Sequence, residues 1–229
     1  MSHTVHPFAH RLGILRDWKS RWFTLRGREI KYRDNLKADV LVRTFLEKRL
    51  KGMYINSIEI ERGENNMKIS IHTSRPGVII GRSGEGASKL KSEIEKKMRK
   101  LGLAIPSTIK LDIIEIRSPE SHAGIVAEMI IEALEKRMSF RRVIKQIAEK
   151  VMANRDVKGV KIQVSGRLDG ADMSRRETIK KGRLPLQTFR SDVDFAINSA
   201  HLPTGYIGIK VWIYRGDIFK EKGKDTNNK

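Results

Sequence analysis

The chain contains no cysteine among its 229 residues. Disulfide cross-links, thiolate catalysis and cysteine-based zinc sites are therefore excluded. The sequence also lacks an apolar run long enough to span a bilayer, and its first 20 residues carry charges where a signal peptide would have an apolar core. We therefore expect a cytoplasmic protein without a membrane partner.

Acidic residues are scarce as well, since 27 Asp and Glu stand against 47 Lys and Arg, which gives a net charge of +20. The basic excess is spread along the whole chain. A membrane-surface protein would gather such charge on one amphipathic helix, whereas a distributed excess is typical of a protein surrounded by polyanion. The hydrophobic content of 39% favours two small cores over one large core.

Apolar periodicity divides the first half of the chain into short elements. It predicts a helix over 36–51, with Val40, Leu41, Phe45, Leu46 and Leu50 on one face. A hairpin of strands 54–62 and 67–73 follows, because turn residues lie between two alternating runs. The remaining expected elements are a short helix over 76–80, a helix after Gly84 and a strand over 109–116.

A Gly-x-x-Gly sequence, Gly81-Arg82-Ser83-Gly84, joins the two helices of this half. The spacing alone is a weak signal in a chain with 18 glycines, and a second instance, Gly205–Gly208, lies in an alternating run expected to be a strand. The order of elements around the first instance resembles a type II K-homology domain. That resemblance implies that Gly81, Arg82, Ser83 and Gly84 clamp the backbone of about four nucleotides, with Lys89 near a neighbouring phosphate.

The second half predicts an α+β domain of two layers with a mostly antiparallel sheet. Ser118-Pro119-Glu120 is a typical helix start and marks the expected domain boundary. A second helix is expected over 139–152. Strands are expected near 160–165, 176–181, 193–199 and 206–214.

Three clusters of cations are candidate RNA contacts. The helix over 139–152 places Arg141, Arg142 and Lys145 on one face, with Glu149 as the only acid close to them in sequence. The first 35 residues and the segment 167–190 are also basic. Their candidate residues are Arg11, Arg16, Lys19, Arg21, Trp22, Arg167, Arg175, Arg176, Lys180, Lys181 and Arg183.

A series of motifs in order along the chain resembles the bacterial family of the third small-subunit ribosomal protein. The series includes Ser20-Arg21-Trp22-Phe23, Pro76–Gly81, Phe140-Arg141-Arg142, Val164–Leu168, Gly182–Leu186 and Gly208–Ile213. The resemblance implies binding to 16S rRNA in the head of the small subunit, beside neighbouring small-subunit proteins. It further implies that Arg141, Arg142 and Lys145 contact incoming mRNA and help to open its structure.

We therefore expect four parts. They are a basic and aromatic extension (1–35), a type II K-homology RNA-binding domain (36–117), a C-terminal α+β domain (118–217) and a polar tail (218–229). No catalytic group, metal, cofactor or small-molecule substrate is expected.

Two alternatives stay open from the sequence. The first is a ribosome-free K-homology regulator of transcripts. The second is an RNA-processing enzyme that holds Mg²⁺ with Asp192 and Asp194, although we expect these acids to pair with Arg190 or to flank the sheet edge.

Overall fold

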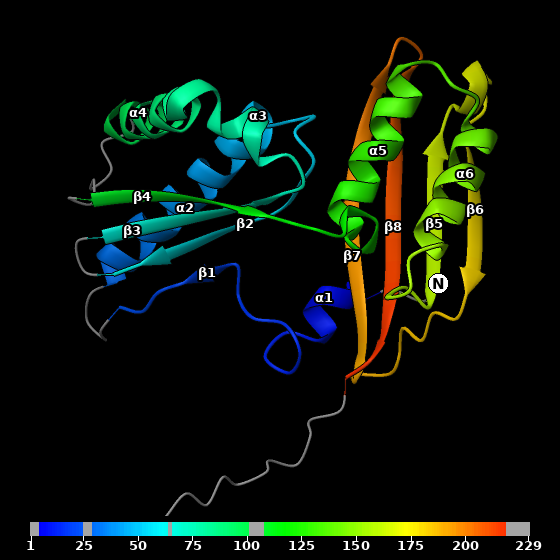
Figure 1. The fold of residues 1–229 in the computed structure, drawn as a ribbon, viewed down its shortest axis with the longest axis horizontal. Helices are drawn as coiled ribbons and strands as arrows, with labels where there is room; N and C mark the ends of the chain where they lie inside the picture. The colour runs from blue at the N-terminus through cyan, green and yellow to red at the C-terminus, as the bar shows by residue number, and fades with distance from the viewer. Residues whose placement is uncertain (1–4, 25–28, 64–65, 101–107, 219–229) are drawn as a thin grey trace, which may run out of the picture. The chain divides into compact units, whose positions relative to one another are not determined.

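The computed structural model describes residues 5–24, 29–63, 66–100 and 108–218 (Figure 1). The chain divides into two compact units. One, the K-homology unit, is Trp18–Glu132; the other, the C-terminal unit, is Met1–Asp17 together with Ala133–Lys229. The predicted polar tail lies, from residue 219 onward, outside the described residues.

The K-homology unit is built on a four-stranded sheet with the strand order β1-β2-β3-β4. The strands are β1 (Ser20–Arg21), β2 (Ile55–Arg62), β3 (Asn66–Thr73) and β4 (Thr108–Glu115). Strands β2 and β3 pair antiparallel, as the hairpin prediction requires, and β4 joins β3 in parallel. Strand β1 extends the sheet by pairing in parallel with β2.

Three helices complete this unit, namely α2 (Glu29–Arg49), α3 (Pro76–Ile80) and α4 (Glu85–Lys100). Helices α2 and α4 share one core with β2, β3 and β4, because apolar side chains repeat at helical spacing on the former and alternate on the latter. The order α2-β2-β3-α3-α4-β4 confirms the predicted α-β-β-α-α-β arrangement.

Helix α2 differs from the prediction in its start and in its buried face. It begins at Glu29, seven residues before the expected position. None of residues 31–37 is buried, so the first turns of α2 lack the apolar periodicity from which a helix start is predicted. The buried face is Ala38, Val42, Leu46 and Leu50, and Val40, expected on that face, is 51% exposed.

The predicted helix start at Ser118 is wrong. Pro119–Ser121 forms a single 3-10 turn, His122 is extended, and helix α5 begins at Ala123 and ends at Glu135. Ser118 Oγ lies 3.0 Å from Ser121 Oγ and makes no capping hydrogen bond. The boundary between the two units falls within α5, after Glu132.

The sheet of the C-terminal unit is antiparallel throughout, with the order β6-β5-β8-β7. Its strands are β5 (Gly159–Gly166), β6 (Arg175–Gly182), β7 (Ser191–Leu202) and β8 (Gly205–Asp217). Helix α6 (Phe140–Met152) packs on β5 and β6. Its apolar residues, among them Val143 and Ile144, are buried as the periodicity predicts.

The N-terminal segment is tied to the C-terminal unit by one buried arginine. Arg11 follows the short helix α1 (Pro7–His10), which packs against β7, and it is 0% exposed. Its guanidinium donates hydrogen bonds of 2.5–3.3 Å to five backbone carbonyls, those of Pro7, Pro185, Leu186, Thr188 and Ser191. Burial lowers the pKa of Arg11 from its ordinary value, and the nearby charge of Asp192 opposes that shift.

A buried carboxyl group on α5 lies against the K-homology sheet. Burial raises the pKa of Glu128 to about 7, while a backbone hydrogen bond from Ile55 and the charge of Lys51 oppose the shift. Its Oε2 atom has no hydrogen-bond partner among the described residues. The charged form of this side chain therefore carries a desolvation cost that these two contacts offset only in part.

No helix among the described ranges has the length and apolar character needed to cross a membrane.

We predict that Arg11→Met destabilises the C-terminal unit by about 3 kcal/mol or more, because five carbonyls lose their donor inside the fold. Urea unfolding followed by circular dichroism measures this loss. Arg155→Met, at an exposed position, is the control. Equal unfolding midpoints for the two variants would contradict the structural role of Arg11.

We predict that Glu128→Gln stabilises the protein above pH 7 by about 1–3 kcal/mol. The folded-state pKa of about 7 lies above the ordinary 4.5, so the folded state binds the extra proton and wild-type stability falls as pH rises between these values. The variant removes that slope, whereas Glu135→Gln, exposed on the same helix, leaves it. Thermal unfolding from pH 4.5 to 8 measures the difference, and identical slopes for wild type and Glu128→Gln would refute the assignment.

Candidate nucleic-acid interface

The Gly-x-x-Gly loop is exposed and held in a backbone conformation that its glycines permit. Residues 82–84 form a 3-10 turn between α3 and α4, and Gly81 and Gly84 have φ of 69° and 80°. Ser83 also lies in the left-handed region, with φ of 51°. Arg82 and Ser83 are exposed at the tip, and the loop leads directly into the N-terminus of α4, which favours an anion.

A third glycine, Gly86, is required by this geometry and was missed by the motif. A Cβ at Gly86 would lie 2.4 Å from the carbonyl oxygen of Ile79, closer than any side chain tolerates. Gly86 therefore lets α3 and α4 approach each other and brings the loop to its tight shape. The spacing Gly81, Gly84, Gly86 is the signal in the sequence that would have found it.

The charges at this loop are open to an external ligand. Arg82 makes no ion pair among the described residues. Lys89 lies 3.4 Å from Glu85 one turn earlier, but both side chains are largely exposed. Such exposed pairs contribute less than about 1 kcal/mol, so a phosphate competes for Lys89 at little cost.

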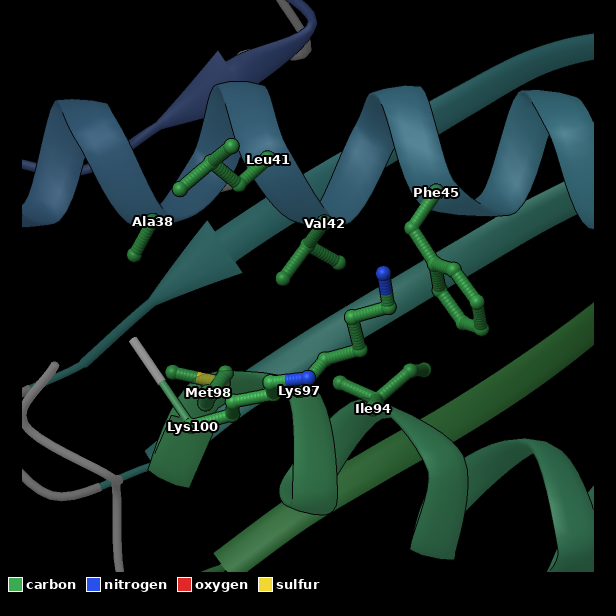
Figure 2. Close-up of a pocket in the computed structure, with 8 residues that line it drawn as sticks. All are labelled: Ala38, Leu41, Val42, Phe45, Ile94, Lys97, Met98 and Lys100. Atoms are coloured by element: carbon green, nitrogen blue, oxygen red, sulfur yellow. The ribbon is translucent and has the colours of Figure 1, made fainter. Parts of the chain in front are cut away.

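A pocket of about 290 Å³ lies between α2 and α4 (Figure 2). Ala38, Leu41, Val42, Phe45, Ile94 and Met98 line it, together with Lys97 and Lys100. Lys97 extends over the ring of Phe45 at 5.2 Å from its centroid. The α4 residues of this lining lie in the C-terminal half of that helix, whereas the loop precedes its N-terminus, so the pocket is not part of the loop site.

Helix α6 holds its three candidate cations on the side opposite its buried face. Arg141, Arg142 and Lys145 are all exposed. Arg142 and Lys145 make no ion pair among the described residues. Arg141 differs, because it lies 3.2 Å from Glu177, although its side chain stays 69% exposed.

Glu177 and Phe140 bring Arg141 together with a second predicted contact, Arg175. The Arg175 Nε lies 3.8 Å from Glu177, and both guanidinium groups lie over the Phe140 ring, at 5.5–5.6 Å. Glu149, the acid expected beside the helix cations, binds Lys181 at 2.9 Å, and the charge of Lys145 also acts on it. The hydrogen bond from Lys181 lowers the pKa of Glu149, so this pair stays charged.

Several candidates from the sequence are engaged within the fold. Arg11 is buried and offers no surface to an external phosphate. Arg21 binds Glu59 and Glu61 at 2.7 and 2.6 Å, and Trp22 donates to Asp39 at 2.7 Å. The contacts of Arg21 and Trp22 hold this part of the N-terminal segment against β2 and α2.

The remaining candidates lie nearer the surface. The backbone carbonyl of Lys19 accepts a hydrogen bond from the N–H of Ile60 in β2. Arg167 binds the Ala171 carbonyl and lies 3.5 Å from Asp172. Those that are exposed without an ion pair among the described residues are Arg176, Lys180 and Arg183.

The paired carboxylates Asp192 and Asp194 are occupied by arginines. Arg16 lies 2.6 Å from Asp192, and Arg215 lies 3.0 Å from Asp192 and 3.8 Å from Asp194. The expected partner, Arg190, instead lies 3.6 Å from Asp217. Two cations in the place of a metal ion argue against a nuclease site, and the described residues contain no cluster of three His, Asp or Glu side chains suited to a metal.

Comparison with known proteins assigns both halves of the chain. Residues 41–121 match the KH domain family, and residues 130–213 match the family "Ribosomal protein S3, C-terminal domain". The chain is 44% identical to the small ribosomal subunit protein uS3 of Caldicellulosiruptor saccharolyticus, over 97% of this chain and 96% of that protein. It is 39% identical to uS3 of Streptococcus mutans over the full length of both chains, and 41% identical to uS3 of Endomicrobium trichonymphae over 98% and 92%.

We predict that Arg82→Asp with Ser83→Asp weakens binding to a single-stranded RNA oligonucleotide by about tenfold or more, because two carboxylates replace a cation at the loop tip. Fluorescence anisotropy measures the affinity. The matched control is Ser92→Asp with Arg99→Asp, the same changes at exposed positions further along α4. Equal losses in both double variants would reject the loop as a specific contact.

Proposed function

The chain belongs to the uS3 family of small ribosomal subunit proteins, and we propose that it binds 16S rRNA in the head of the subunit and lines the tunnel through which mRNA enters. As a member of this family it is a structural constituent of the small subunit and not an enzyme. We place it with the ribosome in the cytoplasm, in contact with neighbouring small-subunit proteins.

The observation that carries the mRNA proposal is the pair Arg142 and Lys145 on α6. Both cations are exposed and unpaired among the described residues, and the buried apolar face of α6 fixes the helix on its sheet. Cations at fixed spacing on a rigid element bind successive phosphates of one strand. A strand held in this way is kept from pairing again with its complement.

Arg141 contributes to the same surface in a different way. Its ion pair with Glu177 is largely exposed and therefore weak, so Arg141 is able to exchange Glu177 for a phosphate. The guanidinium of Arg141 also lies over the Phe140 ring. We propose that Arg141 joins Arg142 and Lys145 when RNA is present.

The K-homology loop supports the rRNA part of the proposal. Bare backbone at Gly81 and Gly84, an exposed Arg82 and the start of α4 together suit a nucleic-acid backbone. A ribosome-free regulator would need the same loop. The match to uS3 proteins along the whole chain, including the C-terminal domain, favours the ribosomal role.

We predict that Arg142→Ala with Lys145→Ala slows translation through an mRNA hairpin several-fold and leaves translation of an unstructured mRNA nearly unchanged. Small subunits reconstituted with the variant chain, and a translation assay with the two messages, measure this ratio. Lys91→Ala with Lys96→Ala, two exposed positions on α4, is the control.

An unchanged hairpin-to-unstructured ratio in the α6 variant would contradict the role of this helix in opening mRNA. Glu177→Gln adds a second check, because it frees Arg141 without altering the helix. We expect this variant to translate the hairpin at least as fast as wild type.

A further inference from the structure

The C-terminal sheet has a face turned away from α6, and along β5, β6 and the adjoining part of β8 the described residues of this face include cations and no acid. Strand register places Lys161 of β5 directly opposite Lys180 of β6, and Ser165 opposite Arg176. On the other side of β5, Gln163 pairs with Lys210 of β8. Side chains of paired residues point to the same face, and the neighbours Val160, Ile162 and Val164 are buried on the other one.

Part of this face is already covered by the chain itself. Val193, Trp212 and Tyr214 form a small apolar cluster with Leu184, Leu186 and Phe195. Beyond this cluster the face is open, because Arg176, Thr178, Lys180, Ile197, Ser199 and Lys210 are all exposed. Together with Lys161, Gln163 and Ser165, these six residues form the open sheet face.

The charges of the open sheet face are not neutralised from within. None of Arg176, Lys180 and Lys210 makes an ion pair among the described residues. Glu177, the acid between Arg176 and Thr178, points to the opposite face, where it binds Arg141. Lys161 is held over the Trp212 ring at 4.7 Å from its centroid, so it stays on the sheet surface.

Lys161 and Lys180 face each other across neighbouring strands, an arrangement that destabilises a sheet unless an anion lies between the two charges. Gln163, Ser165, Thr178 and Ser199 surround the cations with neutral hydrogen-bonding groups. Lys, Arg, Ser, Thr and Gln are the side chains that contact phosphate and sugar oxygens. A rigid grid of cations and hydroxyls without carboxylates is complementary to a phosphodiester backbone.

We propose that the open sheet face binds the backbone of ribosomal RNA, while the cations of α6 on the other side of the same unit remain available for mRNA. This inference rests on the proposed function and names a binding surface for it. Lys161 and Lys210 become RNA contacts that are not among the candidates from the sequence, and Arg176 and Lys180 are assigned to the same surface. The C-terminal unit then binds RNA on two opposite sides. Its sheet binds ribosomal RNA, and its helix α6 contacts mRNA.

The test is a salt titration of rRNA binding by the full chain. The triple variant Arg176→Gln, Lys180→Gln and Lys210→Gln leaves Lys161 and its contact with Trp212 intact. We expect the slope of log affinity against log salt for transcribed 16S rRNA to become shallower by about 2–3, since each lost phosphate contact removes about 0.7–0.9. Thermal unfolding confirms the fold, with a midpoint equal to or above that of wild type because repulsion is relieved.

The control removes the same charge elsewhere, with Lys37→Gln, Lys48→Gln and Lys91→Gln at exposed positions of the K-homology unit. We expect this triple variant to change the slope by less than about 1. If the sheet variant binds with the wild-type slope and affinity, the inference is overturned while the proposed function stands.

Two further outcomes are decisive. If wild type itself does not bind 16S rRNA, the proposed function fails, and the inference with it. If the sheet variant keeps its rRNA affinity but loses a neighbouring protein from reconstituted subunits, the face is a protein interface and the RNA assignment is overturned.

Discussion

Ion pairing inside the chain decides which charges remain for RNA. The least exposed carboxylates are used to join elements that are distant in sequence. Asp39 on α2 accepts from Arg62 of β2 and from Trp22. Asp192 on β7 accepts a hydrogen bond from Arg16 and forms an ion pair with Arg215. Because the acids are engaged in this way, the loop tip, the outer side of α6 and the open sheet face keep their cations.

This division into paired and unpaired charges couples the stability of the fold to RNA binding. With a net charge of +20, the cations repel one another in the folded state. This repulsion is strongest at the surfaces that have no acids. Buried pairs such as Asp39 with Arg62 are little affected by salt, whereas exposed cations are screened within about 10 Å at moderate ionic strength. A polyanion bound at those surfaces relieves the repulsion and stabilises the folded state by mass action. In the proposed function, ribosomal RNA supplies this counter-charge.

The sequence predicted those features that depend on local periodicity. The hairpin of β2 and β3, the buried faces of α4 and α6 and the alternation of β8 all follow from spacing of apolar residues, and the structure contains them. The start of α2 did not follow, because its first turns are solvated. The start of α5 did not follow either, because Ser118 bonds Ser121 where a cap was expected.

The residues of the candidate site also differ in whether local spacing or tertiary contacts determine their exposure. Arg142 and Lys145 are exposed because helical spacing alone places them opposite a buried face. Arg11 resembles them in sequence but is buried, and four of its five carbonyl partners lie 174–180 positions further along the chain. The pair of Arg141 with Glu177 and the facing of Lys161 with Lys180 likewise depend on tertiary register, which residue type does not reveal.

The most direct measurement is a cryo-EM map of the small subunit that contains this chain together with bound mRNA. The account predicts phosphate oxygens within about 4 Å of Arg82, Arg142 and Lys145, with mRNA at the two α6 residues. It is contradicted if these three side chains instead bind carboxylates of this chain or of neighbouring proteins, with no nucleic acid in reach.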